Sequence, residues 1–324
     1  MASMFPRAVS QRMILVSVLT LSIGSAISVH VRSRYLAASE LTDRIGDGGV
    51  LGNFLDKSLI TCAAMCQEIC TCFGHHVKDS RCRLHEQCLD ASLTGSEVGW
   101  QYFRKVSGNT DCQTLHSEQG VMLSGVYTIR TKGYDDHSVY CDMTTEGGGW
   151  TVILKRTDGS VDFAKNWDAY KNGFGDASSE YWIGNEMIHH LTKQNLPAML
   201  YVMITHVNGT TFYQIYHQFS VSSENDGYQL SIGETTGTLG DSIMPTGNLK
   251  QNLKGMMFST AEKDQDRYDV GNCAKLYKGG WWFNACHYAF LTGPFGSDGW
   301  FKPWYPVFTH GHQIQAVIMM TKRK

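Results

Sequence analysis

The stretch "GNCAKLYKGGWWFNACH", from Gly271 to His287, decides the fold of this chain. Two cysteines bracket a Gly-Gly pair that is followed by Trp281, Trp282 and Phe283. Large aromatic side chains bury much apolar surface, so we expect these three to lie mainly in a core. The segments on either side of the stretch indicate what kind of domain holds that core.

An acidic segment, "STAEKDQDRYDV", stands directly before this stretch. It concentrates four acidic residues where there is neither a helical nor a strand period, in a chain of which only 18% of the residues are charged. A solvated surface loop would explain the composition. A hard-cation site would also explain it, because calcium prefers carboxylate and carbonyl oxygens. Asp264 and Asp266 can share such an ion only if the backbone wraps around it.

The N-terminus is typical of a secretory signal peptide. Arg7 and Arg12 precede the uncharged run "MILVSVLTLSIGSAI", which ends in small residues. At about 15 residues the run is short for a membrane span, which needs about 20. We therefore predict a signal peptide over residues 1–28 and a leader over 29–49. A signal anchor is the alternative, because Arg32 and Arg34 follow closely.

The ten cysteines are an even number and fall into two blocks. An even count fits disulfides in a secreted protein, whereas zinc bound by thiolates is the other interpretation of the first block. That block holds Cys62, Cys66, Cys70, Cys72, Cys82 and Cys88. The polar stretch "VSGNTDC" separates it from the second block, so we place a domain boundary there. The net charge of −2 gives no reason to expect a nucleic-acid partner.

The first block, residues 50–106, is too small for a large core without disulfides. The spacing of "SLITCAAMCQEIC" predicts a short helix capped by Ser58 or Thr61, and strand-like segments follow. The order of cysteines resembles that of PAN/apple modules, which bind proteins or glycans. This resemblance implies Cys62–Cys82 and Cys66–Cys72 disulfides, and elimination leaves Cys70–Cys88.

The second block, residues 107–324, alternates short strand-like runs with Gly-rich breaks. A helix is expected within "YWIGNEMIHHLTKQ" and a hairpin around Asn208-Gly209. These elements predict an α+β fold with a central antiparallel sheet. The ordered motifs "VYCDM", "GGGWTV", "YWIGNEMIHHLT", "FSTAEKDQD" and "GNCAKLYKGGWWFNACH" resemble the fibrinogen C-terminal domain family. The resemblance implies Cys112–Cys141 and Cys273–Cys286 disulfides.

The resemblance also implies a calcium site that stabilises a long loop. Relatives in this family bind Ca²⁺ through two aspartates and two later carbonyls, which match Asp264, Asp266 and the carbonyl of Tyr268. The segment after Asp266 is one residue longer here, so the second carbonyl is that of Val270 or of Gly271.

Ficolin-like members of the family hold an acetyl group beside this loop. The matching positions are the backbone donors at Cys286 and His287, the aromatic wall Tyr277, and Asn272, whose peptide bond to Cys273 is expected to be cis. The segment after His287 departs from the family and is shorter. Phe295, or alternatively Trp300, would have to supply the second aromatic wall. His287 is alternatively a structural histidine.

Two functions remain open on this evidence. The first is a secreted, calcium-dependent lectin that binds acetylated glycans in innate defence. The alternative is a fibrinogen-domain ligand that binds a protein receptor or matrix protein. An enzyme is not expected, since no Ser-His-Asp cue, phosphate-binding loop or His-Glu-x-x-His motif is present. No membrane span is expected after signal cleavage, oligomers are left open, and Asn208 begins a glycosylation sequon that is either used or unused.

Overall fold

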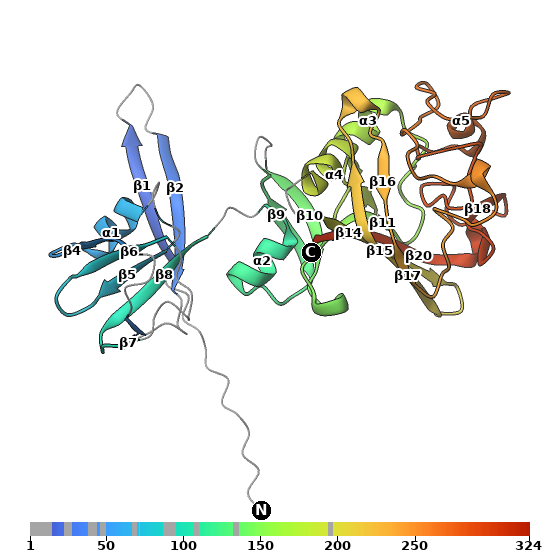
Figure 1. The fold of residues 1–324 in the computed structure, drawn as a ribbon. Helices are drawn as coiled ribbons and strands as arrows, with labels where there is room; N and C mark the ends of the chain where they lie inside the picture. The colour runs from blue at the N-terminus through green and yellow to red at the C-terminus, as the bar shows by residue number, and fades with distance from the viewer. Residues whose placement is uncertain are drawn as a thin grey trace, which may run out of the picture. The chain divides into compact units, whose positions relative to one another are not determined.

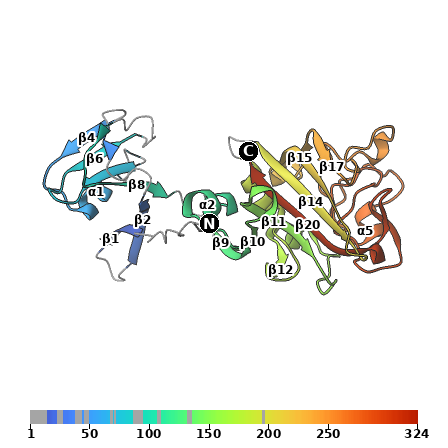
Figure 2. The ribbon, with the colours of Figure 1, turned by 90° about the horizontal axis from the view of Figure 1, so that it is seen from below.

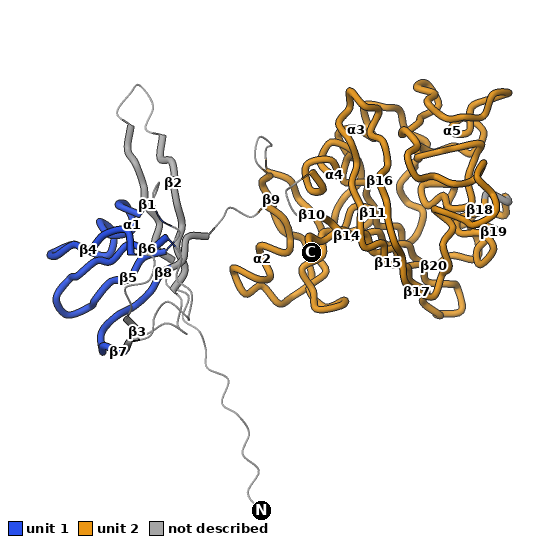
Figure 3. The backbone as a smooth tube through the Cα atoms, in the orientation of Figure 1, with its two compact units in different colours: residues 1–107 blue, residues 108–324 orange. Residues whose placement is uncertain are grey.

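The computed structural model describes residues 15–22, 28–37, 44–45, 50–66, 70, 72–86, 95–106, 110–131, 136–193 and 197–324. The chain divides into two compact units, residues 1–107 and residues 108–324 (Figure 3). Each unit has a sheet and a hydrophobic core of its own. No helix within these described ranges is long and apolar enough to cross a membrane.

The first unit is built on a six-stranded antiparallel sheet in the order β1-β2-β8-β5-β6-β4. Its strands are β1 (Leu15–Ser22), β2 (Ser28–Ala37), β4 (Val50–Phe54), β5 (Cys72–His76), β6 (Cys82–His85) and β8 (Trp100–Val106). A separate pair is formed by β3 (Arg44–Ile45) and β7 (Gly95–Ser96). Helix α1 (Leu59–Cys66) begins at Ser58, whose hydroxyl accepts the N–H of Thr61 at 3.2 Å. The helix buries Ala63 against Phe73 and Phe103 of the sheet.

The N-terminal strands differ from the loose leader expected over residues 29–49. Strands β1 and β2 form a hairpin, and β2 pairs with β8 from Arg34–Val106 to Ala37–Phe103. The sequence "SVHVRSRY" alternates apolar with polar residues at first, a period that suits an extended strand. Removal of residues 1–28 concerns processing of the chain and stays a prediction, as does the PAN/apple resemblance of this unit.

The disulfides of the first unit correct the sequence analysis in part. Cys62 pairs with Cys82 as expected, which joins α1 to β6. Cys66 pairs with Cys70, so the expected Cys66–Cys72 and Cys70–Cys88 bonds are wrong. The reason is local, because the N–H of Cys70 donates to the carbonyl of Cys66 at 3.2 Å, which brings the two cysteines close together. Cys72 is also disulfide-bonded, and Cys88 lies outside the described residues.

The second unit is built on a ten-stranded antiparallel sheet with the main order β12-β13-β11-β20-β14-β15-β16 (Figure 1). The strands are β9 (Gly125–Ile129), β10 (His137–Asp142), β11 (Trp150–Arg156), β12 (Phe174–Gly175), β13 (Tyr181–Trp182), β14 (Ala198–His206), β15 (Thr211–Val221), β16 (Leu230–Ile232), β17 (Thr235–Gly237) and β20 (Ile314–Arg323). The β14–β15 hairpin confirms the predicted turn around Asn208-Gly209. Strand β20 lies between β11 and β14, so the centre of the sheet joins segments far apart in the sequence.

Four short helices and several 3-10 turns complete this unit. The helices are α2 (Cys112–Gln119), α3 (Trp167–Asn172), α4 (Asn185–Thr192) and α5 (Cys273–Tyr277), and the 3-10 turns are Thr145–Gly147, Glu224–Asp226, Leu249–Gln251 and Gly311–Gln313. Helix α2 begins at Asp111, whose carboxylate accepts the N–H of Thr114 at 2.8 Å. It ends at Gly120 with φ of 68°, a left-handed conformation that favours glycine. Helix α4 confirms the predicted helix and buries Met187, Ile188 and Leu191.

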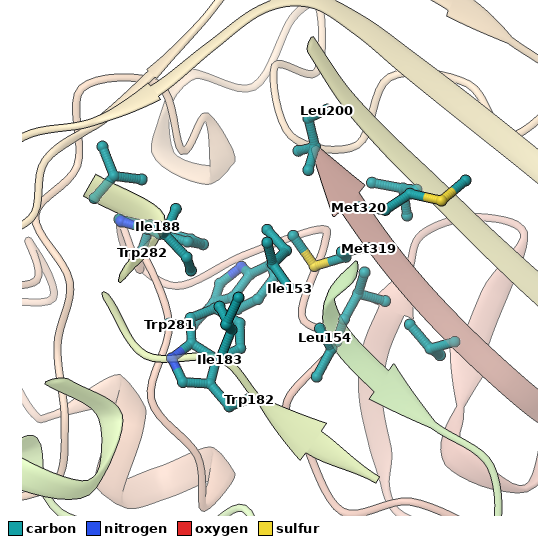
Figure 4. Packing of buried hydrophobic residues seen from close by; sticks show 14 of the residues in the cluster. Ile153, Leu154, Trp182, Ile183, Ile188, Leu200, Trp281, Trp282, Met319 and Met320 are labelled. Atoms are coloured by element: carbon teal, nitrogen blue, oxygen red, sulfur yellow. The ribbon is translucent and has the colours of Figure 1, made fainter. Parts of the chain in front are cut away.

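The core of the second unit is rich in aromatic side chains. Trp281, Trp282 and Phe283 are each at most 1% exposed, which confirms the sequence prediction. Figure 4 shows Trp281 and Trp282 packed with Trp182 and with Met319 of β20. The indole N–H of Trp282 donates to the carbonyl of Tyr228 at 2.7 Å, so this large ring is buried with its polar atom satisfied.

The segment between β17 and β20 holds little regular structure. It contains α5, the strands β18 (Trp300–Trp304) and β19 (Phe308–His310), and two isolated bridges, Ser259–Trp281 and Ala289–Trp304. Figures 1 and 2 both show α5 at the end of the second unit that is far from α2. Few strands pair in this region, so packing between its buried aromatic rings stabilises it and positions its surface loops.

An aspartate loop beside an aromatic pair

The aspartate loop, Ser259 to Cys273, is folded around the carboxylate of Asp266. One oxygen of Asp266 accepts the N–H of Tyr268 at 2.8 Å and the other accepts the N–H of Cys273 at 2.8 Å. Asp264 lies close by, because its carboxylate accepts the N–H of Asp266 at 3.2 Å. The wrapped backbone required for two converging aspartates is therefore present.

The side chains of Gln265 and Asn272 hold the backbone of this loop. Gln265 donates its amide to the carbonyl of Phe258 at 2.6 Å, and its N–H donates to the hydroxyl of Ser259 at 2.9 Å. Asn272 caps α5, because its side-chain oxygen accepts the N–H of Lys275 at 2.7 Å. Asn272 was expected at the ligand pocket, and the structure gives it this capping role.

The electrostatics of the loop centre on the carboxyl group of Asp266. Burial raises the pKa of the Asp266 carboxyl, and the neighbouring charge of Asp264 raises it further. Since each oxygen of Asp266 accepts one N–H, each keeps a lone pair for another partner. No cluster of three or more His, Cys, Asp or Glu side chains within the described ranges is arranged to hold a metal, so a cation here would need backbone carbonyls as well. Val270 and Gly271 are the two candidates for the second carbonyl. Val270 is 82% exposed, and Gly271 donates its N–H to the carbonyl of Tyr268 at 3.1 Å.

Tyr277 and His287 form an aromatic pair next to the loop. Their rings meet edge to face with centroids 4.6 Å apart. The His287 side chain is only 3% exposed and also contacts Phe283 at 5.5 Å and Phe290 at 5.0 Å. Tyr277 is half-buried, and burial raises the pKa of its hydroxyl. The structure therefore brings Tyr277 and His287 together as predicted, with the histidine largely enclosed by rings.

A disulfide and a buried asparagine join the aspartate loop to the aromatic pair. Cys273 is bonded to Cys286, and the N–H of Arg267 donates to the carbonyl of Asn284 at 3.1 Å. The Asn284 side chain donates to the carbonyls of Leu249 at 2.9 Å and Asn252 at 2.7 Å. Sequence reasoning missed Asn284. Its position between an aromatic run and a cysteine was the only available signal.

The cis peptide bond of this region is Ala285–Cys286, so the expectation of a cis bond at Asn272–Cys273 is wrong. The cis bond therefore joins Ala285 to Cys286, in the segment that ends with His287. Asn272 instead adopts the extended conformation of a helix N-cap, with φ of −118° and ψ of 113°.

Phe295 is not part of the aromatic pair. Its ring lies 5.1 Å from the guanidinium of Arg156, and a methyl group added to Gly159 would come within 3.3 Å of it. Arg156 in turn donates to the carbonyl of Gly293 at 3.0 Å. Phe295 therefore lies beside Arg156, the last residue of β11. Nothing is described for the side chain of Trp300, the other candidate for a second wall.

The comparison with protein families fits this geometry. Residues 108–321 match the C-terminal globular domain of the fibrinogen beta and gamma chains. The chain belongs to the fibrinogen C-terminal domain family. The Cys112–Cys141 and Cys273–Cys286 bonds that the family resemblance implied are both present.

Relatives of the fibrinogen family match the second unit of this chain. Human fibroleukin is 45% identical over 157 residues, which cover 48% of this chain and 35% of fibroleukin. Bovine fibrinogen-like protein 1 is 42% identical over 223 residues, or 65% of this chain and 69% of that protein. The chain therefore spans about a third of fibroleukin and somewhat more than two thirds of fibrinogen-like protein 1.

Solved structures of the fibrinogen family share this fold. The fibrinogen-like globe domain of human ANGPTL6 is 34% identical, with a TM-score of 0.60, and the match covers 68% of this chain and 97% of that domain. Lamprey fibrin D-dimer, complexed with the peptide ligand Gly-His-Arg-Pro-amide, is 30% identical with a TM-score of 0.58. That match covers 65% of this chain and 72% of the lamprey chain.

The predicted glycosylation sequon of this fibrinogen domain lies on the β14–β15 turn. Asn208 and Thr210 are both exposed, and the side-chain oxygen of Asn208 accepts the N–H of Thr210 at 2.9 Å. The turn leaves the side chain accessible to a modifying enzyme, and attachment of a glycan stays a prediction.

Proposed function

We propose that this chain is an extracellular protein whose fibrinogen domain binds another protein at the face formed by the aspartate loop and the Tyr277–His287 pair. The observation that carries this proposal is the placement of Phe295 against Arg156 and Gly159. An acetyl pocket needs an apolar wall opposite Tyr277. The contact of Phe295 with Arg156 and Gly159 speaks against the first of the two side chains that the sequence offered for this wall.

Protein recognition, the alternative named in the sequence analysis, therefore has more support than acetylated glycans. A relative of the same fold, lamprey fibrin D-dimer, is complexed with a short peptide. By analogy, an extended peptide segment from a protein receptor or matrix protein is the proposed ligand here. Tyr277 offers an aromatic anchor, and the half-buried ring has a polar hydroxyl at its tip, as is common in protein interfaces.

Calcium is the proposed cofactor of the aspartate loop. The ion would be held by Asp264, Asp266, the carbonyl of Tyr268, and the carbonyl of Val270 or Gly271. Burial raises the pKa of Asp266 and the charge of Asp264 raises it further, and bound Ca²⁺ would offset both effects by stabilising the ionised carboxylates. The Cys273–Cys286 bond and the Arg267–Asn284 hydrogen bond would transmit this stabilisation to the aromatic pair.

Secretion is proposed on two grounds. The disulfides of both units would persist in an oxidising compartment, and residues 1–28 have the pattern of a signal peptide. A binding role is proposed because the described residues of this face offer an aromatic anchor, Tyr277, and the chain belongs to the fibrinogen C-terminal domain family.

The test is binding of the secreted chain to a panel of cell types, measured by flow cytometry. Cells are treated with trypsin, with a glycosidase, or left untreated, and free N-acetylglucosamine is the competitor. We expect trypsin to remove binding, and we expect the sugar at tens of millimolar to leave it unchanged. Binding that survives trypsin and is displaced by N-acetylglucosamine would restore the lectin interpretation.

A pair of variants assigns the binding to this face. Tyr277→Ala should weaken binding by about 2 kcal/mol, the usual cost of truncating an aromatic anchor. Tyr127→Ala is the matched control, because Tyr127 is a half-buried tyrosine on β9 at the opposite end of the globe. Equal losses in the two variants would show that the proposed face is not the binding site.

A further inference from the structure

A groove opens on the sheet of the first unit, and all of its lining residues belong to that unit. Its volume is about 240 Å³, less than a drug-sized ligand needs and enough for one or two side chains. It is lined by Asn53, Phe54, Leu55, Arg81, Cys82, Arg83 and Trp100. Among the described residues, the lining includes two arginines and no carboxylate, so the groove is suited to an anionic group.

The two arginines are held in place by the buried ring of Trp100. Arg81 lies 5.2 Å and Arg83 lies 5.4 Å from the ring centroid, and Trp100 is only 1% exposed. Arg81 is also bonded to Asp79 at 2.9 Å and to Glu97, neither of which lines the groove. These two contacts fix the plane of the Arg81 guanidinium before any ligand arrives, which reduces the ordering cost of binding. They also offset part of its charge, so an incoming carboxylate would gain directed hydrogen bonds from Arg81 more than net attraction.

Asn53 connects the groove to an open edge of the sheet. Arg83 donates its Nε–H to the side-chain oxygen of Asn53 at 2.6 Å, and the two residues are partners across β4 and β6. Strand β4 ends the sheet order, and in the part of the chain that the structure describes no strand pairs with its other edge. Leu51 and Leu55 flank Asn53 at alternate positions and are 47% and 69% exposed.

We propose that β4 and this groove together bind an extended acidic segment of a partner protein. The segment would add a strand to the open edge of β4, where main-chain hydrogen bonds supply affinity. One Asp or Glu side chain would enter the groove and accept hydrogen bonds from Arg81 and Arg83. Apolar side chains two positions before and after it would cover Leu51 and Leu55. The site is independent of the function proposed for the fibrinogen domain.

The open edge favours a peptide over a free anion. A small carboxylate would use the arginines alone and leave the exposed leucines and the strand edge uncovered. An extended peptide uses all three features, and its side chains alternate with the period of the exposed residues on β4. The sequence motif expected is therefore apolar, any residue, Asp or Glu, any residue, apolar.

The experiment is a selection of phage-displayed random peptides of about nine residues, long enough to pair with the whole of β4, against the full secreted chain. Selected peptides should be enriched for Asp or Glu at one position, with apolar residues two places away on both sides. The best peptide is then synthesised with Glu, with Gln, and with N-methyl groups on the pairing edge, and free glutarate is the small-anion arm. Affinity should fall about tenfold for Gln and further for the N-methylated peptide, because charge-assisted and main-chain hydrogen bonds are lost.

Variants of the chain complete the test. Arg83→Gln should weaken the Glu peptide about tenfold and leave the Gln peptide little changed. Lys78→Gln is the matched control, because it removes one exposed positive charge from the same unit outside the groove lining. Asn53→Asp places a carboxylate beside Arg83 without altering the size of this exposed side chain. This variant should therefore bind the Gln peptide more tightly than the Glu peptide.

Several results would overturn the proposal. They are a selection without an acidic position, equal losses in Arg83→Gln and Lys78→Gln, and unchanged affinity on N-methylation. Binding of glutarate as tight as that of the Glu peptide would also reject the strand and leave only an anion site. If Arg83→Gln fails to fold, the affinities of Asn53→Asp for the Glu and Gln peptides are the test. Tighter binding of the Glu peptide by that variant would then reject the proposal.

Discussion

Replacement of Glu180 by alanine should destabilise the fibrinogen domain strongly. Glu180 is fully buried and lies 3.7 Å from the guanidinium of Arg156, which is itself only 2% exposed. Its carboxylate accepts the N–H groups of Thr157, Asp158, Gly159 and Val161 at 2.6 to 3.1 Å. The variant leaves a buried cation without its counter-charge and four N–H groups without their acceptor.

The expected loss is about 3–5 kcal/mol of unfolding free energy, the usual effect of removing one partner of a buried ion pair. Summing four hydrogen bonds to a charged acceptor would give a larger figure. That sum is too large here, because Thr157, Asp158 and Gly159 are exposed and water can replace the carboxylate at their N–H groups. Glu180→Gln should cost less than Glu180→Ala, since its amide oxygen can still accept some of these N–H groups.

The assay is urea unfolding followed by tryptophan fluorescence, which reports mainly on this domain because Trp100 is the only tryptophan before residue 108. Burial alone would raise the pKa of Glu180, but the four backbone N–H groups hold it below its ordinary value of 4.5. The stabilisation is therefore complete above about pH 4.5 and is lost as the pH falls through the lowered value. Glu180→Gln should abolish this part of the pH dependence. A loss below about 1 kcal/mol for Glu180→Ala at pH 7 would refute the reasoning, because the buried Arg156–Glu180 pair would then contribute little to the stability of the domain.

Three further predictions concern other features. The Asp264→Ala, Asp266→Ala double variant should lose calcium-dependent stabilisation, which for the natural chain is about 2.7 kcal/mol at a hundredfold excess over the dissociation constant; equal melting of the natural chain in calcium and in chelator would exclude the site. Asn208→Gln should abolish a glycosidase-sensitive mobility shift of the secreted chain, and no shift in the natural chain would show that the exposed sequon is unused. Asp111→Ala removes both the α2 cap and the 2.7 Å ion pair with Arg323, so thermal unfolding should show a loss of about 1–2 kcal/mol; a change within a few tenths would show that water replaces the carboxylate.

The fold of the second unit was predictable because its signals are local and repeated. The apolar spacing of Met187, Ile188 and Leu191 marks α4, and Asn208-Gly209 marks the hairpin turn. The ordered family motifs then indicated the fibrinogen C-terminal fold, which the family comparison confirms. The N-terminal hairpin was not predicted, because an apolar run is compatible both with a signal peptide and with a strand.

The candidate site was predictable only in part. Asp266, Tyr277 and His287 lie in motifs close together in sequence, and the fold brings them near one another as expected. The contact of Phe295 with Arg156 could not be predicted, because Arg156 is 139 positions earlier and buried, so no local pattern indicates it. The Cys66–Cys70 bond was missed because chain order does not determine disulfide connectivity.

The central place of β20 sets the order in which this domain can mature. Strand β20 pairs with β11 on one side and β14 on the other, yet every other strand of the sheet precedes it along the chain. During synthesis, β11 and β14 must therefore wait, with their inner edges open, until Ile314–Arg323 has emerged from the ribosome and reached them. The nascent domain therefore has two unpaired strand edges for that whole interval, and such edges can pair with other chains.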